Sequence, residues 1–366
     1  MNSVVRNPSL PAGDSEAMWA SLPTFFRQAA EPLRPWLQSP DVIEICCNRP
    51  GEIWVEERGQ IGMKRHVLPQ LDKRAVENLA RIVAGSTDQN VNAERPLLSA
   101  AMPGRERFQA VLAPVAYDGC AFAIRKQVIT DMSLEQYRMM GGFDHVVVSG
   151  DQDAVPEQAG AGLSALDREL VARLQDQSPE GIQDWLRFAV KNRVSMIISG
   201  GTASGKTTLL NGLLKEIPET ERLVSIEDTA ELRPTQPNYL RLVASKGGQG
   251  RAATTIQDCL EACLRLRPDR IMMGEIRGAE AYSFLQAINT GHPGSISTLH
   301  ADSPYLAYER LAMMVMQAGL GLTKDDLVRF VRYAVPVIVQ IARNPETGKR
   351  GVSGIYFNKW RGQSDA

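Results

Sequence analysis

The spacing of apolar residues changes from helical to alternating early in the chain. Six apolar residues between Trp19 and Leu33 recur at helical spacing, but prolines interrupt them, so we expect several short helices. This stripe is typical of core packing, with contact to a membrane surface or a partner as the alternative. We expect a small α+β unit over residues 17–130, after a polar, disordered leader over residues 1–16. Within it, strands are predicted at 42–46, 52–56, 108–112 and 120–126, and a helix at 73–84 that Gly85 closes.

The second half of the chain has a different pattern, in which largely apolar strands alternate with helical runs. Residues 140–163 are rich in Gly, Asp, Gln and Ala, and we expect residues 131–185 to form a linker with helices. Residues 186–360 predict an α/β domain with a parallel sheet. Its predicted strands are 195–199, 223–226 and 271–273, and helices are predicted at 167–174 and 181–191.

The composition of the chain argues against several classes of protein. The 41 basic and 42 acidic residues give a formal charge of −1, whereas a dedicated duplex-DNA protein usually has a basic excess, so stable duplex binding is not expected. The five cysteines contain no paired CxxC motifs, which argues against a zinc site and fits a reducing compartment. Cys259 and Cys263 are expected in a core. With neither a signal peptide nor a long apolar run, we expect a soluble protein with at most peripheral membrane contact.

The most specific motif begins where the strand 195–199 ends. A helical run follows it, so the motif G-x4-G-K-[ST] stands in the strand–loop–helix context of a phosphate-binding loop rather than a structural glycine turn. Backbone N–H groups of such a loop surround phosphates, and the helix N-terminus adds a favourable dipole. We expect ATP to bind here, with Lys206 reaching the β- and γ-phosphates and the Thr207 hydroxyl ligating Mg²⁺. The motif is Gly200-Gly201-Thr202-Ala203-Ser204-Gly205-Lys206-Thr207-Thr208.

Acidic residues follow two of the predicted strands. Glu227 and Asp228 follow the strand 223–226, and the carboxyl ends of parallel strands face the ligand crevice of an α/β sheet. Such carboxylates position water or Mg²⁺, so we take Glu227 as a catalytic candidate and Asp228 as a metal-ligand candidate, against a solvated acidic turn. Glu275 follows the strand 271–273. A role in orienting water and a role in binding Mg²⁺ both remain open for it.

A glycine-containing segment carries two of the chain's four histidines, His292 and His300. A single histidine is most often structural, but this pair, within nine positions of the chain and close to glycines, favours function. A histidine at a strand end can donate a hydrogen bond to the γ-phosphate and so report its presence. We therefore take His300 as a catalytic candidate.

With these motifs in this order, the chain resembles the hexameric secretion ATPases with a RecA-like core, which drive type IV secretion, type II secretion and type IV pili. GGTASGKTT is similar to their Walker A box, SIEDTAEL to their aspartate box, LRLRPDRIMMGEIR to their Walker B box and GHPGSISTLHAD to their histidine box. EICCNRPGEIWVE, ERPLLSAAMPGRERFQAVLAP and FAIRK are similar to the N-terminal domain of type IV secretion traffic ATPases. Ala203 departs from the family, which usually has glycine there.

The resemblance implies an α/β fold, in which a RecA-like P-loop ATPase domain follows a smaller α+β N-terminal domain. It implies a homo-hexameric motor on the cytoplasmic face of the bacterial inner membrane. The implied partners are inner-membrane proteins of the secretion complex and the secreted substrate or its coupling protein. Arg107 and Arg125 match N-terminal arginines that reach the nucleotide phosphates, with surface or structural arginines as the alternative. A type II secretion or pilus ATPase, and less so a nucleic-acid translocase, a P-loop kinase or an assembly scaffold, remain alternatives.

Overall fold

The chain divides into two compact units, and the main division falls between Val128 and Ile129. Each unit is described by itself below. Among the described helices, none has the length and apolar character needed to cross a bilayer. The computed structural model describes residues 12–58, 60, 62–126, 131–150, 163–202, 204–244, 254–319, 321–344 and 348–361.

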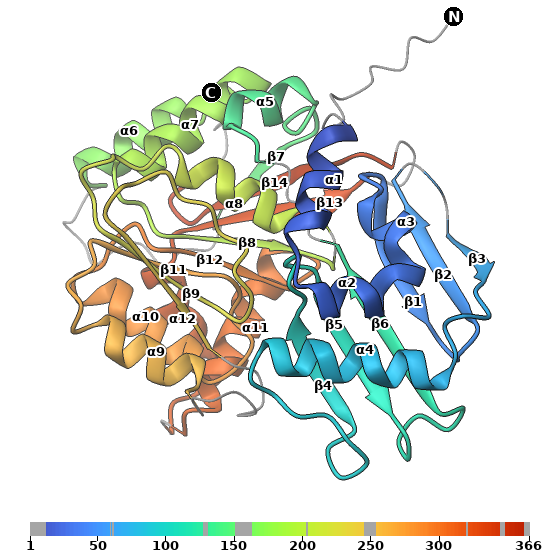
Figure 1. The fold of residues 1–366 in the computed structure, drawn as a ribbon. Helices are drawn as coiled ribbons and strands as arrows, with labels where there is room; N and C mark the ends of the chain where they lie inside the picture. Colours follow the sequence, from blue (N-terminus) through green and yellow to red (C-terminus); the bar gives the residue numbers. More distant parts are fainter. Residues whose placement is uncertain are drawn as a thin grey trace, which may run out of the picture. The chain divides into compact units, whose positions relative to one another are not determined.

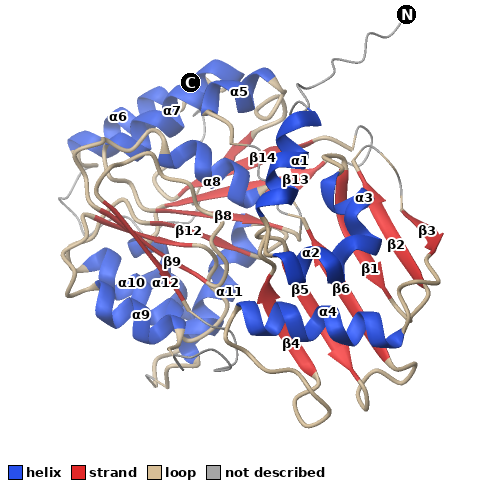
Figure 2. Ribbon diagram, in the orientation of Figure 1, coloured by secondary structure: helices blue, strands red, loops and turns tan. Residues whose placement is uncertain are grey.

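The first unit is a six-stranded antiparallel sheet covered by short helices (Figures 1 and 2). Trp19, Phe26 and Leu33 from the helices share one core with Ile45 and Ile124 from the strands, which confirms the predicted short helices and their packing role. The strand order is β3-β2-β1-β6-β5-β4. The elements are α1 (Ala12–Ser21), α2 (Thr24–Ala30), η1 (Glu31–Leu33), α3 (Arg34–Gln38), β1 (Val42–Cys47), β2 (Glu52–Glu57), β3 (Met63–Val67), α4 (Lys73–Ser86), β4 (Leu97–Ala101), β5 (Arg107–Leu112) and β6 (Cys120–Arg125).

Two predicted boundaries in this unit are corrected. Helix α1 begins at Ala12, and Glu16 accepts a hydrogen bond of 2.6 Å from Arg34, so residues 12–16 belong to the folded unit rather than to a disordered leader. Residues 1–11 lie outside the described residues. Helix α4, predicted to end at residue 84, continues two residues further to Ser86, and the Thr87 hydroxyl donates to carbonyls of its last turn.

The second unit is an eight-stranded sheet with helices on both faces. Ile198 of β8 packs in the core beneath α5–α8, and its neighbour Ile197 packs in the other core, with α9–α12. Cys259 and Cys263 lie in this second core, as predicted. The strand order is β10-β9-β11-β12-β8-β13-β14-β7. The elements from β8 onward are β8 (Met196–Gly200), α8 (Lys206–Leu214), β9 (Leu223–Glu227), β10 (Tyr239–Val243), α9 (Ile256–Cys263), β11 (Arg270–Met273), α10 (Glu280–Asn289), β12 (Ile296–Leu299), α11 (Pro304–Met316), α12 (Lys324–Ala334), β13 (Val337–Arg343) and β14 (Arg350–Phe357).

The stretch expected as a linker, residues 131–185, contributes four elements to this unit. Strand β7 pairs in parallel with β14, and Arg138 of α5 donates to Gln183 of α7 at 2.8 Å. Trp185 of α7 is fully buried, and its indole N–H donates to Leu170 O of α6 at 2.9 Å. These elements therefore extend the sheet and cover one of its faces. They are α5 (Leu134–Met139), β7 (Val147–Ser149), α6 (Ala165–Arg173) and α7 (Pro179–Lys191).

Candidate nucleotide site

The expected site residues follow the ends of four parallel strands that are neighbours in the sheet. The strands lie in the order β9-β11-β12-β8, and each neighbouring pair is parallel. Glu227 ends β9, Glu275 follows β11, His300 follows β12 and Gly200 ends β8. Parallel neighbours end at the same edge of a sheet, which is where ligands of open α/β folds bind. Residues up to a hundred positions apart therefore converge on one edge.

The phosphate-binding loop runs from β8 into helix α8, which begins at Lys206. Gly205 precedes the helix with a φ of +101°, a left-handed conformation that glycine adopts without strain. No atom lies within 4 Å of the position that a Cβ would occupy on Gly201 or Gly205, so the loop leaves room for a ligand close to its backbone. Ala203 lies outside the described residues. Thr202 is exposed at the loop, and Thr208 lies in the first turn of α8.

Lys206 lies folded over this loop. Its Nζ donates to Gly200 O at 2.8 Å and to Gly201 O at 2.9 Å, and it lies 3.2 Å from His300 Nδ1. Burial lowers the pKa of Lys206 to about 8, against an opposing effect of the Glu275 carboxylate. The Ser204 hydroxyl, in the same loop, is buried and has no hydrogen-bond partner among the residues that the structure describes. A buried polar group without a partner is costly, so the loop offers a hydroxyl and an ammonium to an anionic ligand.

His300 connects Lys206 to Glu275. An ammonium has only donors, so His300 Nδ1 accepts from Lys206, and Nε2 carries the proton that it donates to Glu275 Oε1 at 3.0 Å. Arg277 Nη2 donates to the other oxygen, Oε2, at 2.7 Å. Burial by itself would raise the pKa of Glu275, but these two hydrogen bonds outweigh it and lower that pKa to about 2. Glu275 is therefore an anion fixed at both oxygens.

The acidic segment after β9 separates into residues with different contacts. Glu227 is buried, and its Oε2 accepts from the backbone N–H groups of Glu231 and Leu232 at 2.6 and 2.8 Å. Glu231 in turn accepts from the Thr207 hydroxyl at 3.2 Å. Asp228 accepts from Arg277 at 2.6 Å. The contacts of Glu227 favour positioning of the loop over the catalytic role expected from the sequence, and they bring Glu231 to Thr207.

Two residues of this edge received no role from the sequence, Glu231 and Arg277. Both lie inside the segments that carry the family resemblance. The available signal for Glu231 was its place four residues beyond Glu227 in the acidic turn. Arg277 stands two residues beyond Glu275, but an arginine after a strand is common, and its contacts depend on which strands are neighbours.

Arg107 and Arg125 lie in the first unit. They are directly opposite one another on the antiparallel strands β5 and β6, so their side chains share a face of that sheet. Arg125 lies opposite Glu44 of β1 as well, and its Nη2 donates to Glu44 Oε2 at 3.3 Å. The two arginines thus form one row with an acid across three strands.

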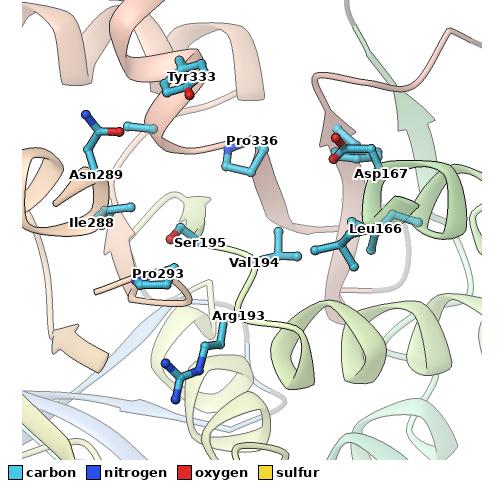
Figure 3. Close-up of a pocket in the computed structure, with 13 residues that line it drawn as sticks. Leu166, Asp167, Arg193, Val194, Ser195, Ile288, Asn289, Pro293, Tyr333 and Pro336 are labelled. Atoms are coloured by element: carbon cyan, nitrogen blue, oxygen red, sulfur yellow. The ribbon is translucent and has the colours of Figure 1, made fainter. Parts of the chain in front are cut away.

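A cavity of about 280 Å³ lies at the other edge of the second unit's sheet. Figure 3 shows Ser195, Pro293 and Pro336 around it, and these residues precede β8, β12 and β13. This cavity lies at the amino ends of the strands, and none of the expected site residues lines it. His292 lies at this edge too, where its Nδ1 donates to Pro268 O at 2.9 Å. The structure thus separates the two histidines that the sequence paired.

Comparison with known proteins gives matches along nearly the whole chain. The family model described as Type II/IV secretion system protein matches residues 169–349. The type IV secretion system protein VirB11 of Brucella suis is 35% identical over 335 residues, which cover 90% of this chain and 89% of the relative. The PtlH homolog of Bordetella bronchiseptica is 37% identical over 324 residues, with 87% and 90% covered. The solved structure of the Legionella pneumophila ATPase DotB has a TM-score of 0.52 at 18% identity, and the match covers 90% of this chain and 81% of DotB, which supports the fold.

Proposed function

The chain belongs to the VirB11 family of type IV secretion ATPases, and on that premise we propose that the edge carrying Lys206, Glu275 and His300 is its site of Mg·ATP hydrolysis. The observation that carries the proposal is the chain of contacts from Lys206 through His300 to Glu275, at 3.2 and 3.0 Å. It joins the cation of the phosphate-binding loop to an acid on a neighbouring strand. Hydrolysis of a bound triphosphate requires a cation at the phosphates and a nearby group that can orient the attacking water.

Residues of the loop and its helix would hold the nucleotide. The backbone N–H groups at the start of α8 and the unpartnered Ser204 hydroxyl would donate to phosphate oxygens. The Lys206 ammonium would exchange the carbonyls of Gly200 and Gly201 for phosphate oxygens, which are stronger acceptors because they are charged. The loop is therefore suited to an anion, and its charged donor is already in place.

Thr207 is the residue expected to ligate Mg²⁺, and its surroundings fit a hard cation. Its hydroxyl lies 3.2 Å from the Glu231 carboxylate, and oxygen ligands of this kind are those that Mg²⁺ prefers alongside phosphate. When bound, Mg²⁺ would neutralise charge on the phosphates. Glu231 would support the metal-binding hydroxyl, while Asp228, already paired with Arg277, would act at a greater distance from the metal.

Glu275 is the acid best placed to orient the attacking water. It is an anion, and both oxygens accept hydrogen bonds from neighbouring side chains, which fix its direction. His300 would hold Glu275 and Lys206 in fixed positions relative to one another. Its hydrogen bond from Lys206 would change when Lys206 turns toward a phosphate. The alternative, that Glu275 binds the metal, makes a different prediction, given in the Discussion.

We further propose that Arg107 and Arg125 bind nucleotide phosphates and that the ATPase works as a homo-hexameric ring. The support is the similarity to secretion ATPases along nearly the whole chain. The ring would act on the cytoplasmic face of the inner membrane with membrane proteins of the secretion complex, and would move a secreted substrate or its coupling protein.

The mass of the particle in solution tests the ring. A ligand that binds the assembled state stabilises it by mass action, so a non-hydrolysable ATP analogue with Mg²⁺ should favour a particle of about six chains. Native mass spectrometry with and without the analogue measures this. Lys206→Ala is the matched control, because its assembly should no longer respond to the analogue. A wild-type protein that stays monomeric under both conditions would contradict the proposed ring.

A further inference from the structure

Arg277 lies between the two loops that carry acids of the site. Its Nη1 donates to Asp228 Oδ2 at 2.6 Å, and its Nη2 donates to Glu275 Oε2 at 2.7 Å. Asp228 follows β9 and Glu275 follows β11, and these strands are neighbours in the sheet. One guanidinium therefore bridges two adjacent strand ends.

The bridge gives Glu275 a defined orientation. Arg277 occupies Oε2 and His300 occupies Oε1, so each carboxylate oxygen has its own donor. The Glu275 side chain is only 15% exposed, and a buried anion that loses a charged partner is strongly destabilised. Without Arg277, Glu275 would be free to rotate away from His300 toward water.

The backbone at Arg277 is held independently of its side chain. The N–H groups of Arg277 and Gly278 both donate to Glu280 Oε1, at 2.7 and 2.9 Å. Glu280 is the first residue of α10, so the turn after β11 is anchored to a helix. The Arg277 guanidinium therefore extends from a backbone that is itself held in place. A side chain that positions another group needs such support.

We propose that Arg277 is a positioning residue for ATP hydrolysis, which holds Glu275 toward His300 and keeps the loop after β9 beside the loop after β11. The proposal rests on the role proposed above for Glu275. Arginine suits this task because its planar fork supplies donors in fixed directions, whereas a lysine ammonium is a point charge on a flexible stem.

Substitutions at Arg277 test the proposal, because a positioning role predicts a change in kcat without a change in nucleotide affinity. A misplacement of about 1 Å at a reacting group can cost about 10²-fold in rate, so Arg277→Ala should lower kcat by about that factor. The dissociation constant of a non-hydrolysable ATP analogue should stay within about threefold of wild type, because ground-state binding is not the interaction removed. Arg277→Lys should recover about tenfold of the loss, since it restores charge without the fork. The matched control is Arg329→Ala, an exposed arginine of α12, which should leave both quantities unchanged.

A double-mutant cycle with Asp228 tests the bridge itself. If Arg277 acts by tying the two loops together, Asp228→Asn should lower kcat, and the double variant Arg277→Ala/Asp228→Asn should be no slower than Arg277→Ala alone. Effects that multiply in the double variant would assign the two residues separate roles and overturn the bridge.

Two further outcomes would overturn the proposal. One is a kcat for Arg277→Ala within about twofold of wild type, since about 10²-fold is expected. The other is a parallel fall of kcat, analogue affinity and melting temperature without recovery in Arg277→Lys, which assigns Arg277 to the fold alone. Glu275→Gln separates this proposal from the proposed function. If that variant is slow while Arg277→Ala is fast, only the positioning role fails; if it hydrolyses ATP at the wild-type rate, the role of Glu275 itself fails.

Discussion

The sheet of the second unit, which is parallel except for the antiparallel pair β13–β14, holds an arginine among acids at each end of its parallel strands, in contrasting ways. At the amino edge, Arg270 is fully buried and donates to both oxygens of Glu221, at 2.6 and 2.9 Å, and to Val190 O at 2.7 Å. At the carboxyl edge, Arg277 is 32% exposed and divides its donors between Asp228 and Glu275.

The difference lies in what the donors of each network serve. At the amino edge, Arg270 serves one acid and one carbonyl, and Arg193 lies 3.4 Å from the same Glu221 carboxylate. The network at the carboxyl edge is an open chain from Asp228 to Lys206, and the loop of Lys206 also carries a buried Ser204 hydroxyl without a hydrogen-bond partner among the described residues. A buried donor that the fold leaves unsatisfied is available to a ligand, so we expect the carboxyl edge to be the functional one. Substitutions at the two edges should therefore change different quantities.

The largest effect on activity is expected at the end of the open chain. Lys206→Ala removes the cation that would stabilise charge developing at the phosphates, and turnover should fall below about one-thousandth of wild type. The fold should remain, because the hydrogen bonds that Lys206 donates within the described residues go to loop carbonyls and His300, not to the core of the unit. Steady-state ATPase assays with circular dichroism measure both. Near-normal turnover in a folded variant would remove the nucleotide site from this edge.

Glu275→Gln should have the next largest effect. The variant keeps the shape of the side chain but loses the anion that would orient water, so hydrolysis should slow by about 10²-fold. Binding of Mg·ATP, followed by titration with a fluorescent analogue, should persist. If affinity is lost and the rate at saturation is not, Glu275 is a metal ligand instead.

A smaller effect is expected in the first unit. Arg107→Ala and Arg125→Ala should each slow turnover at least about tenfold, less than the about 10³ to 10⁵ reported for phosphate-directed arginines. Arg74→Ala, at an exposed position of α4, is a suitable control for the loss of one charge from this unit. Unchanged rates in both arginine variants would confine the nucleotide site to the second unit.

The amino edge should show almost no effect on activity and a large one on stability. Arg270→Met removes both hydrogen bonds from Arg270 to the buried Glu221 carboxylate and leaves Arg193 at 3.4 Å from it, which should lower the free energy of unfolding by up to roughly 3–5 kcal/mol. Arg270→Met/Glu221→Leu should recover part of this loss, because it removes both charges. Urea denaturation measures the change, and ATPase activity at a temperature where the variants are folded should stay within about twofold of wild type. A variant that is stable but inactive would contradict the comparison between the edges.

The sequence predicted best the part of the candidate site whose residues are consecutive in the chain. The loop from Gly200 to Thr208 is continuous in the chain, and its expected strand and helix are present as β8 and α8. Glu275 was identified because it follows an apolar strand, and His300 because it is one of two histidines close to glycines at the end of a short strand. Both strands are wholly buried, but only the one before Glu275 has an apolar pattern in the sequence.

What the sequence could not supply is the order of strands in the sheet. Arg277 matters because β9 lies beside β11, and that pairing joins segments almost fifty residues apart. His292 and His300 lie in the same short segment of the sequence, but His292 precedes β12 and His300 follows it. The short strand β7 was not predicted because three residues carry too weak a pattern, and its pairing with β14 is non-local.

The residue that begins the predicted phosphate-binding loop, Gly200, lies very close to the backbone of the neighbouring strand β13. Gly200 pairs in register with Ile341 of β13, and a Cβ on Gly200 would lie 2.5 Å from Ile341 O. The obstructing atom is backbone, so no side chain can move aside to relieve such a contact. Backbone pairing continues from β13 to its antiparallel partner β14, so the start of the loop is joined to this hairpin. Strand β14 in turn pairs with β7 at the margin of the sheet, which connects the residue that opens the loop to the outermost strand.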